Sequence, residues 1–474
     1  MRQLILSSPY GAHEFKWLDV YGTVYALKGC FGQDRLMVAD PHALQHNLNS
    51  PKFGRAPILD NTASLLFGEG SVITASGSEH RRLRSALNVG FTAAAVRGYE
   101  PVFKRVAEKI VDQLKGFFTA TDVCPVFSPA TLEAISQAIL GHPTQELGED
   151  FVANNIEIVK LTASQSETHI LADAIGSYLA TWVWRAAIYM PTTGAAVARK
   201  ERSFATQVGG RIVQEKIDAA KQGLEMPDND LFSLLLNPNP SDNTKTPSVE
   251  DVIAQIALIL IAGQETTANA LAFGLLELAR HRKFQDELRA EIHSNRGANA
   301  TNMAYENMPL LNAFLKETLR LYPAVPQPDR IALEDTAIPL GESITTLKGE
   351  RISRIPVRKG QLVTLAIASY QRLASRWGVN PDEFNPFRWL DGKTNQGDAV
   401  GPYANLLSFL GGPKICLGWR FAVLEMQVIF CELVGKFAFA EPDGEPPQPR
   451  LMTALLPMNS KGERALPLCI TRVL

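Results

Sequence analysis

The sequence has few of the features that mark several common classes of protein. It contains only 5 cysteines among 474 residues, and none of them form a Cys-x-x-Cys pair. This argues against a disulfide framework and against a zinc site of the usual spacing, and it favours a reducing compartment. The net charge is −2, so the concentrated positive field that binds nucleic acid is not expected.

Long apolar stretches are also missing. The longest candidate, Val252 to Ala262, is interrupted by Gln255 and is shorter than the roughly 20 apolar residues that cross a bilayer. Residues Met1 to Pro9 do not form the basic, apolar and small-residue series of a signal peptide. The chain as given is therefore predicted to be soluble or peripheral and to lack an N-terminal membrane anchor.

Nothing in the sequence divides the chain into separate domains. There is no Gly/Ser-rich linker, repeat or block of like charge, and the one loop-like polar tract, Asn237 to Ser248, directly precedes a long helical segment. With 46% hydrophobic residues the chain can bury a large core. We expect one domain over residues 1 to 474, mainly α with a small β region.

Helical patterns fill most of the chain. A helix is predicted to begin at Asp40-Pro41, and amphipathic helices are predicted from Glu100 to Leu236. The longest helix is predicted over Pro247 to Arg280, where Ser248 and Asp251 have the spacing of a capping box. Breaks between the earlier helices are predicted at Pro125, Pro129, Pro143 and Pro191.

Strand-like segments are few. Residues Gly22 to Val38 alternate apolar and polar side chains around two glycines, which predicts a β-hairpin. Further short strands are predicted around Ile331, around Ile338 and over Val363 to Ile367.

A glycine-bracketed cysteine lies near the C-terminus, in the segment Phe409-Leu-Gly-Gly-Pro-Lys-Ile-Cys416-Leu-Gly418, which opens an apolar helical stretch. A helix N-terminus supplies amide N–H groups and a favourable dipole, and these stabilise a thiolate that binds a metal. Gly412 and Gly418 would let the backbone approach closely, and Phe409 would cover a flat cofactor. A shorter Gly-x-x-x-Cys-x-Gly pattern would more simply be a buried structural cysteine beside a turn.

The complete segment resembles the haem-binding signature of the cytochromes P450, which it matches at Phe409, Gly412, Cys416 and Gly418. The resemblance implies a haem b whose iron is bound by Cys416. The family mostly has arginine two residues before the cysteine. Lys414, which stands there, keeps the cation but not the two-pronged hydrogen bonding to a haem propionate.

An acid and an alcohol are neighbours in the most apolar part of the longest helix, Ala262-Gly-Gln-Glu265-Thr266-Thr. One interpretation is local: Thr266 bonds back to the Ala262 carbonyl, and Glu265 meets a polar neighbour. However, a glycine in mid-helix costs about 1 kcal/mol, and Gly263 would leave room for a flat cofactor. The motif resembles the family's oxygen-binding helix, which implies that Ala262 and Gly263 line the cofactor and that Glu265 and Thr266 relay protons for the activation of dioxygen.

Another motif resembles a supporting network of the same family. Glu317 and Arg320 share one face of a helix, a spacing that by itself is commonly a surface ion pair. Together with Arg388 they resemble the Glu/Arg/Arg network that holds the cysteine loop. The implied role is structural, in haem incorporation rather than in turnover.

Three positions resemble ligands of the haem propionates. His80 and Arg84 match the family's Trp-x-x-x-Arg pair with histidine in place of tryptophan, and Arg330 matches a further ligand. The alternatives are a solvated helix face for the first two residues and a loop arginine in solvent for the third. A basic patch for an acidic flavoprotein is predicted at Arg81, Arg82, Lys414 and Arg420.

The substrate pocket has no fixed motif. Val325, Gln327 and Leu456 lie in mainly apolar segments that are expected to line it. Such walls suit a lipophilic substrate held by few polar groups.

The resemblance implies a monooxygenase that inserts one oxygen atom of O2 into a lipophilic small molecule. NADPH would supply the electrons through a separate NADPH-cytochrome P450 reductase, with cytochrome b5 as a further donor. Two alternatives are a peroxide-using or rearranging enzyme of the same fold, against which the acid–alcohol pair argues, and a non-catalytic haem sensor or carrier.

The loop Ile338 to Pro356 resembles that of fungal microsomal-type members, many of which act on terpenoids, aromatics or other secondary metabolites. Such members usually begin with an anchor helix. If the native chain has an anchor, the expected location is the cytosolic face of the endoplasmic reticulum membrane.

Overall fold

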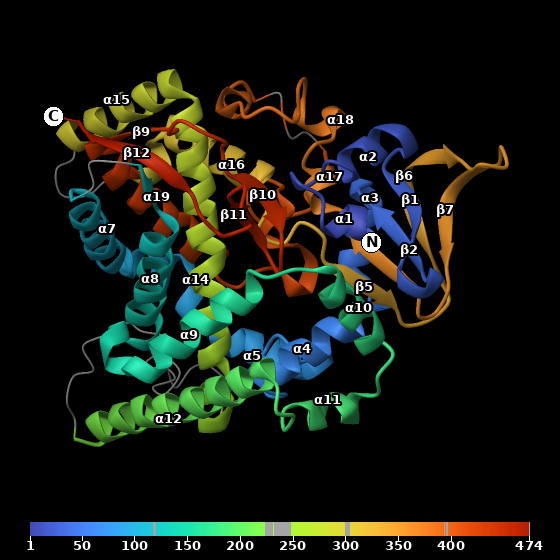
Figure 1. Ribbon diagram of the computed structural model, residues 1–474, viewed down its shortest axis with the longest axis horizontal. Coiled ribbons are helices and arrows are strands. Elements are labelled where there is room, and N and C mark those ends of the chain that lie inside the picture. The colour runs from blue at the N-terminus through green and yellow to red at the C-terminus, as the bar shows by residue number, and fades with distance from the viewer. Residues whose placement is uncertain are drawn as a thin grey trace.

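Helix α14 (Val249–Arg280) runs the length of the molecule in this view, with helices on both sides of it and most of the strands on one side (Figure 1). The structure is a computed structural model, and it describes residues 1–116, 120–222, 231, 248–298, 304–392, 394 and 397–473. It is mainly α with small sheets, as the sequence predicted. The predicted polar tract before α14 and the end of the predicted helical region at Leu236 lie outside the described residues.

The helices account for most of the described chain. The other α-helices are α1 (Arg2–Ile5), α2 (Glu14–Tyr21), α3 (Pro41–Asn49), α4 (Pro57–Phe67), α5 (Gly77–Leu87), α6 (Ala93–Gly98), α7 (Glu100–Leu114), α8 (Cys124–Ile135), α9 (Glu149–Thr162), α10 (Glu167–Gly176), α11 (Thr181–Ala187), α12 (Thr193–Lys221), α15 (Arg282–Ala298), α16 (Pro309–Leu321), α17 (Ile367–Tyr370), α18 (Ala374–Trp377) and α19 (Trp419–Lys436).

The strands are short and form four small sheets. They are β1 (Val24–Lys28), β2 (Asp34–Val38), β3 (Phe53–Arg55), β4 (Thr121–Asp122), β5 (Asp329–Ala332), β6 (Thr336–Thr345), β7 (Arg351–Val357), β8 (Leu362–Leu365), β9 (Phe437–Ala440), β10 (Gln448–Leu451), β11 (Leu455–Met458) and β12 (Pro467–Arg472). The largest sheet has the order β1-β2-β8-β5-β3.

The capping box predicted at the start of α14 is present. The Asp251 N–H donates to Ser248 Oγ at 3.1 Å, and the Ser248 N–H donates to Asp251 Oδ2 at 3.0 Å. At about 1.5 Å per residue the helix is about 48 Å long, and it packs against α8, α12, α16 and α19. These contacts bury most of the helix between Val252 and Ala279.

Contrary to the sequence expectation, α14 is long and apolar enough to cross a membrane when judged by length and composition alone. In the protein, however, 72% of its most apolar window is buried. It contacts α4, α8, α12, α15, α16, α19, β9 and β11 of the same chain. The apolar composition is therefore accounted for by its place in the core.

Two predicted N-terminal features are confirmed. Strands β1 and β2 pair as an antiparallel hairpin, with Val24 opposite Val38. The helix that follows begins at Asp40, whose carboxylate accepts a hydrogen bond from the Ala43 N–H at 2.8 Å.

Two local predictions were wrong. Pro129 does not break a helix but lies inside α8, which continues past it because its buried face packs against α7 and α14. The predicted loop from Ile338 to Pro356 is mostly the antiparallel pair β6–β7. Exposed strands with little apolar alternation gave no clear strand pattern in the sequence.

Candidate functional site

Cys416 lies in the loop that leads into α19, just after the single turn Gly412–Lys414. Its N–H donates to the Phe409 carbonyl at 2.8 Å. Burial raises the pKa of the thiol, while a hydrogen bond from the Gly418 N–H and the charge of Arg84 oppose that rise. The same two groups would stabilise a thiolate at this position.

Cys416 is exposed although protein surrounds it. Both observations hold if the sulfur faces an internal space rather than the outer surface. Ala262, in the middle of the core helix α14, is exposed as well. Side chains on these two elements therefore remain open to the interior of the protein.

The glycines of the cysteine loop differ in what they require. Gly412 has a φ of 66°, and a Cβ there would lie 2.6 Å from the Leu48 carbonyl oxygen at the end of α3. Only glycine fits this position. A Cβ on Gly418 would make an ordinary contact of 3.7 Å with Phe91. Gly418 therefore contributes through its backbone N–H, which donates to the thiol.

Cations gather beside the cysteine loop. Burial lowers the pKa of Lys414 to about 8, and Arg55, Arg330 and Arg84 lower it as well, whereas Asp60 opposes them. The Lys414 ammonium group donates to the Ala75 carbonyl at 2.7 Å. Arg55, which the sequence analysis missed, lies opposite Arg330 in the pair of strands β3–β5.

His80 and Arg84 share a face of α5 next to this cluster, as their spacing predicted. Burial, together with the charges of Lys414, Arg84 and Arg81, lowers the pKa of His80 to about 4. The imidazole is therefore neutral at pH 7 and can donate one N–H to an anion.

The cluster fits the two carboxylates of a haem. Among the described residues, Asp60 is the only carboxylate that acts on the pKa of Lys414 or of Arg330. Arg330 is 8% exposed, and its Nε has no hydrogen-bond partner in the part of the chain that the structure describes. A buried, cation-rich site of this kind requires an anionic ligand.

Replacing Arg330 with glutamine is expected to speed the loss of haem by about 10-fold or more, because a hydrogen bond between charged groups contributes about 1.5–3 kcal/mol. The rate is measured by transfer of haem to an excess of apomyoglobin. Arg354→Gln, on the exposed face of β7, is the control and should leave the rate unchanged. Equal rates of haem loss for the two variants would show that Arg330 does not bind the haem.

Thr266 and Ala262 lie one turn apart on α14, and the Thr266 hydroxyl donates to the Ala262 carbonyl at 2.8 Å. The Thr266 hydroxyl therefore bonds back to its own helix, as one of the two interpretations of the sequence expected. Gly263 does not leave room for a cofactor: a Cβ there would lie 2.8 Å from Cγ1 of Ile135. The prediction for Gly263 was wrong, because this glycine serves the close packing of α14 against α8.

Glu265 has the polar neighbours that the local interpretation required. Its Oε2 pairs with Arg464 Nη1 at 2.6 Å, and its Oε1 accepts from the Ser128 hydroxyl at 2.5 Å. Sequence reasoning missed both partners, since they come from segments more than 130 residues away in either direction.

The Glu317, Arg320 and Arg388 side chains meet in the core. Arg320 contacts both oxygens of Glu317 at 2.8 Å, and Arg388 Nε contacts one of them at 2.9 Å. Glu317 and Arg320 are both 0% exposed. Burial by itself would raise the pKa of Glu317, but the hydrogen bonds and charges of the two arginines lower it overall.

The predicted pocket residues differ in their surroundings. Val325 is 47% exposed, whereas Leu456 in β11 is buried. The Gln327 amide donates to Glu14 and to the Tyr10 hydroxyl near the N-terminus. Gln327 is therefore not a free polar group for a substrate, and its prediction as a pocket contact was wrong in that respect.

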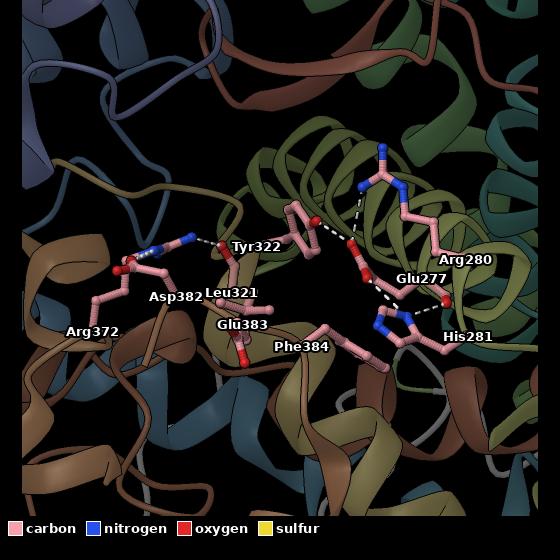
Figure 2. A pocket seen from close by; sticks show the side chains of 9 residues that line it. All are labelled: Glu277, Arg280, His281, Leu321, Tyr322, Arg372, Asp382, Glu383 and Phe384. Atoms are coloured by element: carbon pink, nitrogen blue, oxygen red, sulfur yellow. Dashed lines mark hydrogen bonds and ion pairs between the residues drawn. The ribbon is translucent and has the colours of Figure 1, made fainter. Parts of the chain in front are cut away.

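A separate polar cavity of about 400 Å³ lies at the C-terminal ends of α14 and α16 (Figure 2). Tyr322 and His281 point at the Glu277 carboxylate, and Arg372 pairs with Asp382 at the opposite end. None of the predicted site residues lines this cavity. Most of its charged groups are paired with one another, and it is not the site that the motifs predict.

Glu425 of α19 is a buried acid that the sequence analysis did not identify. It is 0% exposed, and its oxygens have no well-aligned hydrogen-bond partner among the described residues. Burial raises its pKa well above the ordinary value of 4.5, with only the Thr267 hydroxyl opposing. Burial therefore favours the uncharged, protonated form of this acid.

Glu425→Gln is expected to change how stability depends on pH. A raised pKa in the folded state makes the wild-type protein lose stability as pH rises above 4.5, by up to about 1.4 kcal/mol per pH unit. The glutamine variant lacks this loss, so its stability relative to the wild type should increase as the pH rises above 4.5. Urea unfolding at several pH values measures the difference, and parallel curves would show that Glu425 is not protonated.

Comparison with known proteins agrees with this geometry. The family model for cytochrome P450 matches residues 13–465. Cytochrome P450 monooxygenase claU of Ampulloclitocybe clavipes is 29% identical, covering 90% of this chain and 81% of the relative. Cytochrome P450 monooxygenase 91 of Postia placenta is 30% identical, covering 89% of this chain and 82% of the relative.

A solved structure shares the fold. The crystal structure of the cytochrome P450DA heme domain superposes with a TM-score of 0.75 at 21% sequence identity, over 98% of this chain and 93% of that one. With the family model matching nearly the whole chain, and with a cysteine loop and a cation cluster that suit a haem, the chain belongs to the cytochrome P450 family of haem-dependent monooxygenases.

Proposed function

We propose that the protein binds haem b through the Cys416 thiolate and inserts one oxygen atom of O2 into a lipophilic small molecule. The observation that carries this proposal is the accessible Cys416 thiol next to an excess of buried cations. When bound, the haem supplies the oxidising chemistry. Arg84, Arg330 and Lys414 would hold its propionates, with His80 as a neutral donor.

Residues of α14 would hold and transfer protons for the reaction. The Thr266 hydroxyl, one turn from the exposed Ala262, would hold a proton where dioxygen is activated. Glu265 would resupply that proton from the side of α8. Glu317, Arg320 and Arg388 would act at a distance by supporting the loop that carries Cys416.

The proposed substrate class is a terpenoid, an aromatic compound or another secondary metabolite. The similarity to fungal monooxygenases supports it, and so does the apolar character of the segments around Val325 and Leu456.

Electrons are proposed to come from NADPH through a separate reductase, with cytochrome b5 as a further donor. In the predicted basic patch, Arg82 forms ion pairs with Glu79 and Asp251, and the Lys414 ammonium group donates to the Ala75 carbonyl. The exposed Arg81 and Arg420 remain to attract an acidic partner.

The protein is further proposed to sit at the cytosolic face of the endoplasmic reticulum membrane. Exposed apolar side chains on and around α10 and α11 support this location, and Phe31 of the β1–β2 turn contacts Tyr178 beside them. The most exposed of these are Phe31, Tyr178, Trp182 and Tyr189. Trp182→Ser should weaken co-sedimentation with phospholipid vesicles, and unchanged binding would argue against this face.

A spectral titration of the purified ferric protein tests the main proposal. Terpenoids, steroids, fatty acids and small aromatics are added while the Soret band is followed. A low-spin to high-spin shift with one class identifies the substrate preference. A reduced, carbon monoxide-treated protein without the red-shifted band of a thiolate-bound haem would refute the assignment of Cys416.

A further inference from the structure

Glu265 is part of a polar cluster that joins three elements of the fold. The cluster, here called the Arg464 cluster, consists of Ser128 on α8, Gln264, Glu265 and Asn269 on α14, and Arg464 in the turn between β11 and β12. The C-terminal β segment thereby touches the middle of the core helix, which no motif in the sequence indicates.

Both oxygens of Glu265 are occupied from different directions. Arg464 spans one turn of α14, because its Nη1 contacts Glu265 Oε2 at 2.6 Å and its Nη2 contacts Asn269 Oδ1 at 3.0 Å. On the other side, Gln264 donates to the Ser128 hydroxyl at 2.9 Å, and that hydroxyl donates to Glu265. The acid is therefore held in one position by two hydrogen-bonded partners.

The cluster also has polar atoms without protein partners. Gln264 Oε1, Asn269 Nδ2 and Arg464 Nε lack hydrogen-bond partners among the described residues. Gln264 is 3% exposed and Asn269 is 1% exposed. Buried donors and acceptors that the protein does not satisfy are ordinarily satisfied by ordered water. The cluster thus has acceptors and donors for water next to the acid.

Helix geometry places this cluster beside the alcohol. Successive residues of an α-helix are about 100° apart, so Glu265 and Asn269 share one face of α14 while Ala262 and Thr266 share the next. The side chains of Glu265 and Arg464 are 16% and 12% exposed. The acid therefore keeps partial access to solvent beside the face that carries Thr266.

We infer that Arg464 is a positioning residue for proton delivery, an inference that rests on the proposed function. Arg464 holds the Glu265 carboxylate beside the water of the cluster. The carboxylate takes a proton that this water relays from bulk solvent and passes one toward the Thr266 hydroxyl, and this transfer returns the carboxylate to its charged form. The C-terminal turn would then determine how efficiently electrons are used.

The test uses the holoenzyme with its reductase and compares Arg464→Met, Arg464→Lys and Arg472→Met. Arg472, an exposed residue of β12, is the matched control. Arg464→Met is expected to raise the ratio of hydrogen peroxide to product by about 10-fold or more, since a positioned proton donor contributes at least that much. Arg464→Lys should recover part of the coupling, and Arg472→Met should behave as wild type.

A second measurement does not depend on turnover. Urea unfolding of Arg464→Met, Glu265→Gln and the double variant should be non-additive, because the first substitution already removes the pair. Additive effects, or a lower unfolding midpoint for Arg464→Met with an unchanged peroxide ratio, would overturn the inference. If the proposed function itself fails, the wild-type protein will consume no NADPH with substrate, while the unfolding cycle still decides whether the pair is coupled.

Discussion

Replacing Cys416 with alanine is expected to abolish the red-shifted carbon monoxide band of a thiolate-bound haem and all NADPH-dependent product formation. The thiol is the one group in the loop that can donate a charged sulfur to iron, and the Gly418 N–H and the charge of Arg84 favour its thiolate form. The reduced spectrum with carbon monoxide measures the loss directly.

The matched control is Cys431→Ala. Cys431 is a fully buried cysteine of α19 in the same part of the chain, and its replacement should leave the spectrum intact. Circular dichroism of both variants should match the wild type, because removing one sulfur from the loop creates little unfilled volume in a core of this size. A Cys416→Ala protein that kept the red-shifted band would require another iron ligand.

Replacing Glu317 with glutamine is expected to destabilise the protein by about 3–5 kcal/mol, because it leaves two buried arginines without their anion. This is a large part of the roughly 5–15 kcal/mol that holds a domain folded. The Asn385 N–H and the Trp389 indole also donate to Glu317, at 2.8 and 2.9 Å. The expected result is a low yield of haem-loaded protein, measured as haem per chain after expression.

The pH dependence of this effect has a definite sign. The pKa of Glu317 in the folded protein is lower than the ordinary 4.5, so its contribution is present above pH 4.5 and is lost as the pH falls through the lower value. The advantage of the wild type over Glu317→Gln should therefore shrink in acid, as urea unfolding can show.

The control for Glu317 is Glu157→Gln. Glu157 and Lys160 have the same spacing of three residues, but both are exposed, and such pairs contribute at most about 1 kcal/mol. Comparing the two variants thus distinguishes the effect of burial on stability from the effect of the three-residue spacing. Equal stability losses would show that the buried network is not needed.

Sequence reasoning worked best where the residues themselves limit the chemistry or the backbone. The capping box at Ser248, the helix start at Asp40 and the first hairpin depend on neighbours within a few residues. Such local signals survive folding because the partners are already adjacent in the chain.

It worked less well where contacts come from distant segments. Arg55 joins Arg330 through strand pairing, and Arg464 reaches Glu265 from the C-terminal turn. Gly263 suggested space for a cofactor, but Ile135 of α8 packs against it. No pattern along the chain distinguishes these possibilities, because the choice depends on which element lies on which face of α14.

The sequence by itself determined the family, the position of the thiol and the residues that can carry charge, because a cysteine between glycines at a helix start and an acid beside an alcohol in an apolar helix each restrict the chemistry. The tertiary structure alone decided how these charges are used. It brought five cationic or neutral-donor side chains to one edge of the cysteine loop, and it turned Glu265 toward Arg464. The physical reason is that the energy of a buried charge depends on which groups from distant segments surround it.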